Sequence, residues 1–139
     1  MEKMLEIAYK EGIVVEEFSL TDPLKGIYIC QSKATAIGLS SKLESVAEKR
    51  SIMAEELGHH FTTAGYCISR EFYNYSARQY IDKTEYKALR WAANYLISDD
   101  ALLDALQDGI DDIGSLAEHF VVMPEIVQLR LKLFEKPLY

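Results

Sequence analysis

Residues 54–60, which read Ala-Glu-Glu-Leu-Gly-His-His, carry the side chains best suited to metal chemistry. The zinc-binding pattern His-Glu-x-x-His places two imidazoles four positions apart on one helix face, and its glutamate activates a water. The same frame fits residues 55–59, with Glu55 at the first ligand position, Glu56 as the activating glutamate and His59 at the second ligand position. The pattern therefore predicts a metal site in which a carboxylate replaces one imidazole.

A helix must position these residues. Ser41 and Glu44 have the spacing of a capping box, which predicts a helix from about Ser41 to residues 62–65. Its apolar stripe consists of Leu43, Val46, Ala47, Met53, Ala54, Leu57 and Phe61. At about 100° per residue, Glu55 and His59 lie together on a different face. Gly58 would allow another element to approach this helix closely.

The remaining elements surround this helix in sequence. Residues 2–10 are typical of a helix, residues 26–30 and 34–39 of two strands joined as a hairpin, and the run at 13–15 is too short to classify. Residues 66–83 read as a loop with some helix. Further helices are predicted over 82–96, with Asp82 as its cap, then over 98–106, 115–120 and 125–133. The fold class is α+β and mostly helical, in one domain over 1–139 with a C-terminal helical subregion from about 98.

Composition excludes several classes of function. A net charge of −7 argues against nucleic-acid or anionic-membrane binding, and no apolar run is long enough to span a bilayer. The N-terminus lacks the apolar core of a signal peptide. Cys30 and Cys67 have no metal-ligand spacing and are read as free thiols in a reducing cytoplasm, although one disulfide is the alternative.

Three pieces in order give the chain a family resemblance from about Gly26 to Leu133. They are the segment 53–59, the run Glu85-x-x-Ala88-x-x-Trp91-Ala92-Ala93-x-x-Leu96, and the run Leu116-Ala117-x-x-Phe120-x-Val122 followed by Val127, Arg130 and Leu131. In this order they resemble the ImmA/IrrE metallopeptidases of bacteria and their mobile elements. The resemblance implies a zincin-like fold, with the small sheet packed on the metal-site helix and a helix-turn-helix-like pair at the C-terminus.

The resemblance also implies a function. Members are cytoplasmic zinc-dependent endopeptidases or relatives of them, and some cleave a helix-turn-helix repressor encoded nearby. Carried onto this chain, Glu56 matches the general base, His59 the second helix ligand and Glu85 the third ligand. Glu55 departs from the family pattern. Because carboxylates are harder ligands than imidazole, the set Glu55, His59 and Glu85 moves preference from zinc toward Mn or Fe. The alternative is a protein that has lost metal and catalysis and binds a partner as a pseudo-protease.

Plainer interpretations remain open for each residue. Glu55 and Glu56 have the composition of a solvated helix face, and Glu85 stands three positions after Asp82, where it would complete a capping box. His60 lies about 100° round the helix from His59, on the wrong side for a shared metal. His119 is read as structural.

Two longer segments also carry alternatives. A DNA-binding reading of 115–133 is disfavoured because few basic residues are available there, namely Arg130, Lys132 and Lys136. The aromatic stretch from Tyr66 to Tyr80 is read as a cleft in which a tyrosine could stabilise an oxyanion, with loop packing as the alternative.

Overall fold

Six helices and a three-stranded sheet make up the part of the chain that the computed structural model describes, residues 1–21, 24–31, 34–63 and 75–135. The strands are β1 (Ile13–Phe18), β2 (Gly26–Gln31) and β3 (Ala34–Ser40). The helices are α1 (Glu2–Lys10), α2 (Val46–Thr62), α3 (Tyr75–Leu96), α4 (Asp99–Gln107), α5 (Ile113–Phe120) and α6 (Pro124–Glu135). The predicted mostly helical α+β fold is confirmed.

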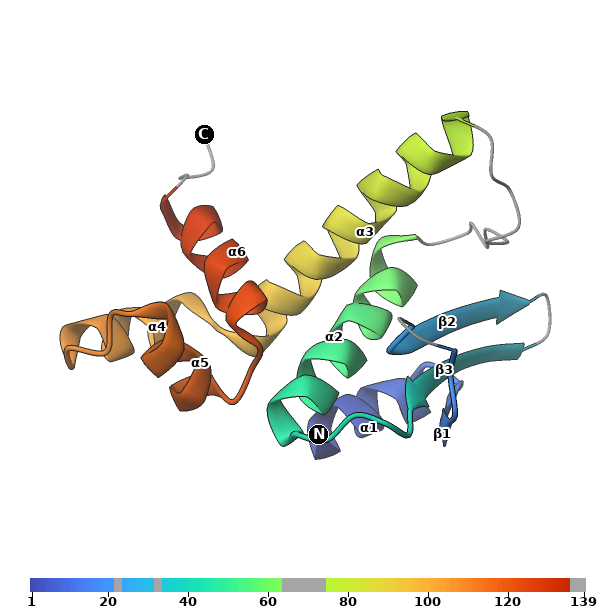
Figure 1. The fold of residues 1–139 in the computed structure, drawn as a ribbon, viewed down its shortest axis with the longest axis horizontal. Helices are drawn as coiled ribbons and strands as arrows, with labels where there is room; N and C mark the ends of the chain where they lie inside the picture. The colour runs from blue at the N-terminus through green and yellow to red at the C-terminus, as the bar shows by residue number, and fades with distance from the viewer. Residues whose placement is uncertain (22–23, 32–33, 64–74, 136–139) are drawn as a thin grey trace.

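The elements are arranged around α2, which separates the sheet from the other long helix (Figure 1). On one side α2 packs against β2 and β3, and α1 packs against β1. On the other side α2 runs beside α3, and α6 packs on α3 and α5. Because α2 lies in the middle, its different faces can contribute side chains to the core, to the sheet and to α3.

The sheet has the order β1-β3-β2, so β2 is an edge strand. β2 and β3 form the predicted antiparallel hairpin, with Tyr28 opposite Ile37, and the unclassified run at 13–15 opens β1, which is parallel to β3. Alternate residues point toward the helices, where Ile37 and Leu39 are fully buried against the core. Side chains on the other face of the sheet, such as that of Val14, are exposed.

Helix α2 begins four residues later than the capping pattern at Ser41 predicts. Ser41 still belongs to the sheet region, where its backbone N–H donates to the carbonyl of Phe18. The working N-cap is Ser45, whose hydroxyl accepts from the backbone N–H of Glu48 at 3.0 Å. Two Ser-x-x-Glu frames follow each other here, and strand pairing leaves only the second free to start a helix. Two members of the predicted apolar stripe, Val46 and Phe61, are exposed.

Gly58 is the point where α2 and α3 come closest. A Cβ at Gly58 would lie 2.3 Å from the carbonyl oxygen of Ala88, which is itself fully buried. Real Cβ atoms do not approach backbone this closely, so the glycine sets the distance between the helices. Glu85 lies one turn before Ala88, and this contact therefore brings it level with His59.

We expect Gly58→Ala to lower the free energy of unfolding by about 1–3 kcal/mol, because the added methyl forces α3 away from α2. This loss would appear despite a gain in helix propensity of up to about 1 kcal/mol. Gly114→Ala in α5 is the matched control, since its Cβ would meet nothing closer than 3.5 Å. Urea denaturation of both variants measures the difference, and equal stability of the two would contradict the close-contact interpretation.

Two predictions about α3 and the cysteines are wrong. Helix α3 begins at Tyr75, so Asp82 lies inside it and cannot be its cap. The polar and aromatic composition of residues 66–83 reads as a loop with some helix and obscures this earlier start. Cys30 is disulfide-bonded rather than free. An isolated cysteine leaves no sequence motif for a disulfide, so this bond depends on the tertiary fold. Cys67 lies outside the described residues.

The C-terminal helices pack as a group rather than presenting a basic surface. α4 lies where a helix is predicted over 98–106 and is capped by Ser98, and α5 is capped by Asp112, whose carboxylate accepts from the backbone N–H of Ser115 at 2.9 Å. Arg130, which a DNA-binding interpretation needs, is buried, donates to the carbonyl of Ile97 at 2.7 Å and pairs with Asp99. It therefore holds α6 against the start of α4 and is withdrawn from solvent.

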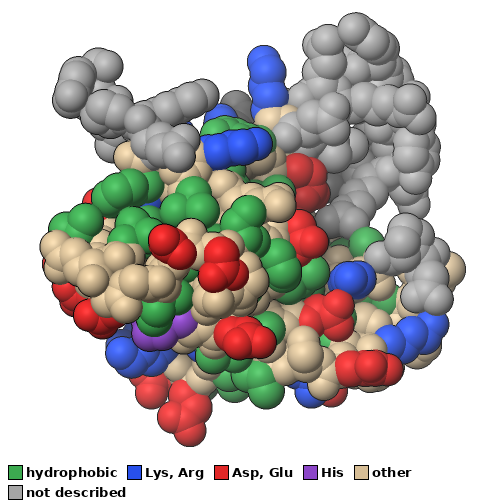
Figure 2. Space-filling model, turned by 60° about the vertical axis from the view of Figure 1, so that its left-hand side comes forward, with side chains coloured by type: hydrophobic (Ala, Val, Ile, Leu, Met, Phe, Trp, Pro, Cys, Tyr) green, Lys and Arg blue, Asp and Glu red, His purple; other side chains and the backbone are tan. Residues whose placement is uncertain are grey.

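Acidic side chains lie among hydrophobic ones over the face that α4, α5 and α6 form (Figure 2). This distribution offers little to a phosphate backbone. Within the described residues, every helix is too short or too polar to traverse a bilayer.

Candidate metal centre

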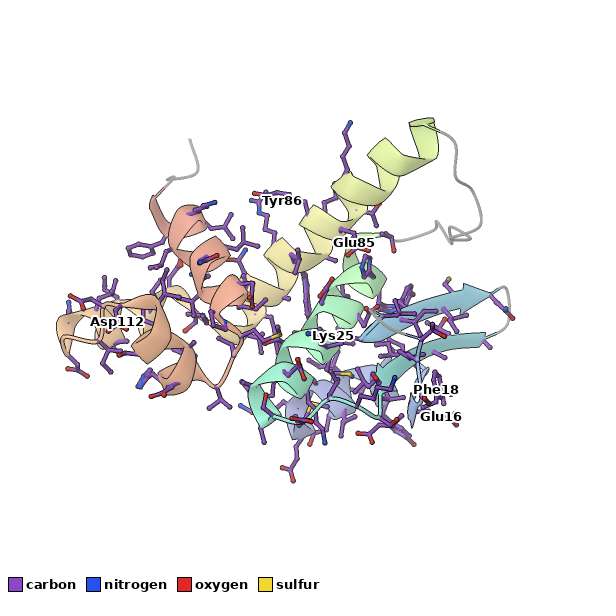
Figure 3. The ribbon with its side chains drawn as sticks, viewed as in Figure 1. Glu16, Phe18, Lys25, Glu85, Tyr86 and Asp112 are labelled. Atoms are coloured by element: carbon purple, nitrogen blue, oxygen red, sulfur yellow. The ribbon has the colours of Figure 1, made fainter. Side chains whose placement is uncertain are left out.

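Three side chains from two helices converge to form a candidate metal centre. Glu55 and His59 come from one face of α2, and Glu85 comes from α3, where it points toward α2 (Figure 3). One ligand atom from each residue can be chosen so that all three lie within 4.8 Å of one another. The i, i+4 spacing supplies the first two ligands and the Gly58–Ala88 contact brings in the third.

His59 lies at the centre of this group and is almost completely buried, with 8% of its side chain exposed. Its Nε2 lies 3.2 Å from a carboxylate oxygen of Glu85, yet it makes no hydrogen bond of good geometry with any described residue. The backbone around it is fixed, because the carbonyl of His59 accepts from the backbone N–H of Thr63 at 3.1 Å. A buried imidazole nitrogen held in this way is poised for a further partner.

The electrostatics of the group are unusual for carboxylates. Burial raises the pKa of Glu55 to about 8, helped by its hydrogen bond with Glu85 and by the negative charges of Glu56 and Glu85. For His59, burial alone would lower the pKa, but the close carboxylate of Glu85 and the negative charges of Glu56 and Glu55 raise it overall. The site thus concentrates negative charge that it cannot fully solvate. Such charge favours a cation.

The residues fit a divalent metal on these grounds. Two carboxylates and one imidazole are legitimate ligands for zinc, manganese or iron, and three protein ligands leave coordination positions open, as catalytic sites require. The orphaned Nε2 and the raised pKa of Glu55 are both features that a cation among the three side chains would relieve. Glu55, His59 and Glu85 are therefore the residues that would hold it.

Glu56 occupies the next face of α2 and is 4% exposed. It belongs to a stripe of four residues at i, i+4 spacing that follows β2: Glu48, Ile52, Glu56 and His60. Lys25 binds Glu48 at 3.0 Å, and a Cβ at Gly26 would lie 2.5 Å from Ile52 and 3.1 Å from Glu56. The start of the edge strand therefore runs directly beside Glu56.

The structure places the other candidate residues from the sequence as follows. His60 turns away from the three ligands toward Tyr28 and Glu11. Glu85 does not cap a helix, since it lies well inside α3, so the capping alternative is wrong. His119 is exposed beside Phe120. The tyrosines expected to line a cleft belong to residues 66–80, whose side chains lie outside the described part.

Sequence reasoning missed Tyr28 and Glu11. Neither belongs to a motif, and their relation to His60 depends on how β2 and α1 dock against α2. The signal that could have drawn attention to Tyr28 is its inward register in the predicted strand, two positions after the glycine. Glu11 has no such signal.

This fold and site define a class: an α+β domain in which a ligand-bearing helix lies between a small sheet and a second ligand-bearing helix, as in metallopeptidases. The chain belongs to the IrrE N-terminal-like domain family of peptidases, whose family model matches residues 8–132. The ImmA/IrrE resemblance is thereby confirmed, and with it a metallopeptidase-like function. A search of curated proteins finds no match.

Proposed function

We propose that this protein is a metal-dependent endopeptidase. The observation that carries the proposal is the convergence of Glu55, His59 and Glu85 on one side of α2, with the buried carboxylate of Glu56 immediately beside them. Membership of a peptidase family supports the same reaction class.

A divalent cation at Glu55, His59 and Glu85 would polarise a peptide carbonyl and make a water more acidic. Glu56 then accepts the proton of the attacking water and returns it to the leaving amine nitrogen. Burial among α2 and β2 keeps Glu56 close to the reacting groups and limits access of bulk water. The carboxylate of Glu55 is a weaker partner for zinc than an imidazole would be, and it shifts preference toward manganese or iron.

The substrate we propose is an extended peptide segment. Because β2 is an edge strand, its outer row of backbone groups can pair with an added strand. The start of β2 lies against Glu56, since a Cβ at Gly26 would be 3.1 Å from a carboxylate oxygen of that residue. By its family resemblance the protein substrate would be a helix-turn-helix transcriptional repressor. The acidic surface of α4 to α6 would favour such a basic partner over direct contact with nucleic acid.

We expect saturating Zn²⁺ or Mn²⁺ to raise the melting temperature of the metal-free protein. A metal present at 100 times its dissociation constant stabilises the folded state by about 2.7 kcal/mol. His59→Ala should abolish the shift, because it removes the central ligand, whereas His119→Ala should keep it, because His119 is exposed and distant in sequence from the site. Differential scanning fluorimetry with each metal makes the comparison. A shift that survives His59→Ala would place the metal elsewhere.

The second candidate is a pseudo-protease that binds the same kind of partner without cutting it. The glutamate at position 55 favours this reading, since the usual imidazole is replaced by a carboxylate that the site holds with a raised pKa. Cleavage assays with a helix-turn-helix repressor encoded beside this protein separate the two functions. Metal-dependent cleavage products support the peptidase, and binding without products supports the pseudo-protease.

A further inference from the structure

A chain of hydrogen bonds outside the metal-ligand group joins three elements at the end of α2. The hydroxyl of Tyr28 in β2 lies 2.8 Å from Nδ1 of His60, and Nε2 of His60 lies 2.9 Å from a carboxylate oxygen of Glu11. The rings of Tyr28 and His60 meet edge to face, with centroids 5.7 Å apart. We refer to these three residues as the Glu11–His60–Tyr28 chain.

The direction of the hydrogen bonds follows from their chemistry. An ionised carboxylate only accepts, so Nε2–H of His60 donates to Glu11, and Nδ1 of the neutral ring must accept from the hydroxyl of Tyr28. Each polar atom thus has one role, and the ring is fixed from both ends. His60 is held more firmly than a surface histidine would be.

The chain completes a set of contacts that align β2 with α2. At the start of the strand, Lys25 binds Glu48 and Gly26 lies against Ile52 and Glu56. Two residues further along the strand, Tyr28 binds His60, one turn beyond Glu56. Contacts between α2 and β2 therefore lie on both sides of Glu56 along the helix, and the Glu11–His60–Tyr28 chain supplies hydrogen bonds on the C-terminal side.

We propose that the Glu11–His60–Tyr28 chain is a positioning device that holds edge strand β2 beside Glu56, and so sets where a peptide paired with β2 presents its scissile carbonyl. This inference rests on the proposed peptidase function. Tyr28, His60 and Glu11 are positioning residues: they act through the strand and need not touch the reacting atoms. Small displacements of a bound peptide are sufficient to slow the chemical step, because reaction requires aligned groups.

The test measures cleavage of a repressor-derived peptide by the zinc- or manganese-loaded protein, well below the melting temperature of every variant. Tyr28→Phe and Glu11→Ala should each lower kcat by roughly tenfold through misplacement of the carbonyl. KM and the dissociation constant of the metal should stay within about twofold, since neither the edge of β2 nor a ligand is removed. Glu11→Gln should retain activity, because its amide oxygen still accepts from Nε2–H.

The matched control is Tyr9→Phe, which removes a hydroxyl from a tyrosine that is 85% exposed. It should behave as wild type. The proposal is overturned if Tyr28→Phe leaves kcat unchanged, or if kcat falls only in step with metal affinity. A rise in KM without a fall in kcat overturns it as well, since that pattern reports lost binding.

A second measurement separates this inference from the proposed function. If the wild-type protein does not cleave, amide hydrogen exchange of β2 decides the matter without an activity readout. Tyr28→Phe and Glu11→Ala should then speed exchange of the β2 amides bonded to β3 by roughly tenfold through local opening, with Glu11→Gln and Tyr9→Phe unchanged. Unaltered exchange in all four variants rejects the chain as a device that holds β2, whatever the protein's reaction is.

Discussion

Glu56→Gln should abolish peptide cleavage while leaving the metal bound. Glutamine keeps the shape of the side chain but cannot accept a proton from the attacking water, so the general-base step is lost. The expected fall in kcat is roughly 10²–10⁴-fold, the usual contribution of such a group. The ligands Glu55, His59 and Glu85 are untouched, so metal content measured by elemental analysis should not change.

The control for this substitution is Glu16→Gln, which makes the same chemical change at an exposed position on β1. It should cleave as wild type does. Equal cleavage by Glu56→Gln and wild type would remove Glu56 from the catalytic role. Absence of cleavage by both proteins, with repressor binding retained by both, would support the pseudo-protease instead.

Glu55→His should tighten zinc binding and raise peptidase activity. The substitution exchanges an anionic ligand for the neutral imidazole that zinc prefers, and it leaves the metal the stronger Lewis acid. It also removes a carboxyl group whose pKa is raised by burial and by its neighbours Glu85 and Glu56. We expect the zinc dissociation constant to fall by roughly tenfold or more, equivalent to about 1.4 kcal/mol of binding free energy.

Competition with a zinc chelator measures this change, and the same titration with Mn²⁺ should show a smaller gain or a loss. Glu55→Gln is the companion variant: it removes the charge without supplying an imidazole and should weaken the binding of both metals. Zinc affinity that is unchanged or weaker in Glu55→His would contradict our account of the carboxylate at this position.

Much of this architecture could be predicted because its signals are local. The spacing of Glu55 and His59 depends only on helix geometry, and the hairpin, α4 and the helix pair at the C-terminus follow from short periodic runs and caps. Glu85 could be assigned to the site only by family resemblance. Its alternative as a helix cap failed because α3 starts at Tyr75, earlier than local composition indicates.

Features that depend on how distant segments dock could not be predicted. The predicted start of α2 is wrong because Ser41 is held at the sheet by a long-range contact, the hydrogen bond from its backbone N–H to the carbonyl of Phe18. The disulfide of Cys30 and the hydrogen bonds of Glu11 with His60 are likewise invisible to periodicity. Arg130 appeared as a possible phosphate contact, and only its burial against Ile97 and Asp99 reveals a structural role.

The contact between Gly58 and Ala88 has a consequence for the whole protein. The candidate ligands come from two helices whose separation this contact fixes, so a metal bound between them would act as a reversible cross-link between distant parts of the chain. By thermodynamic reciprocity, opening of the helix pair would weaken metal binding by the same factor by which bound metal disfavours that opening. The lifetime of such a protein would then depend on the concentration of a divalent ion. The metal-free form would unfold more often and would be degraded faster.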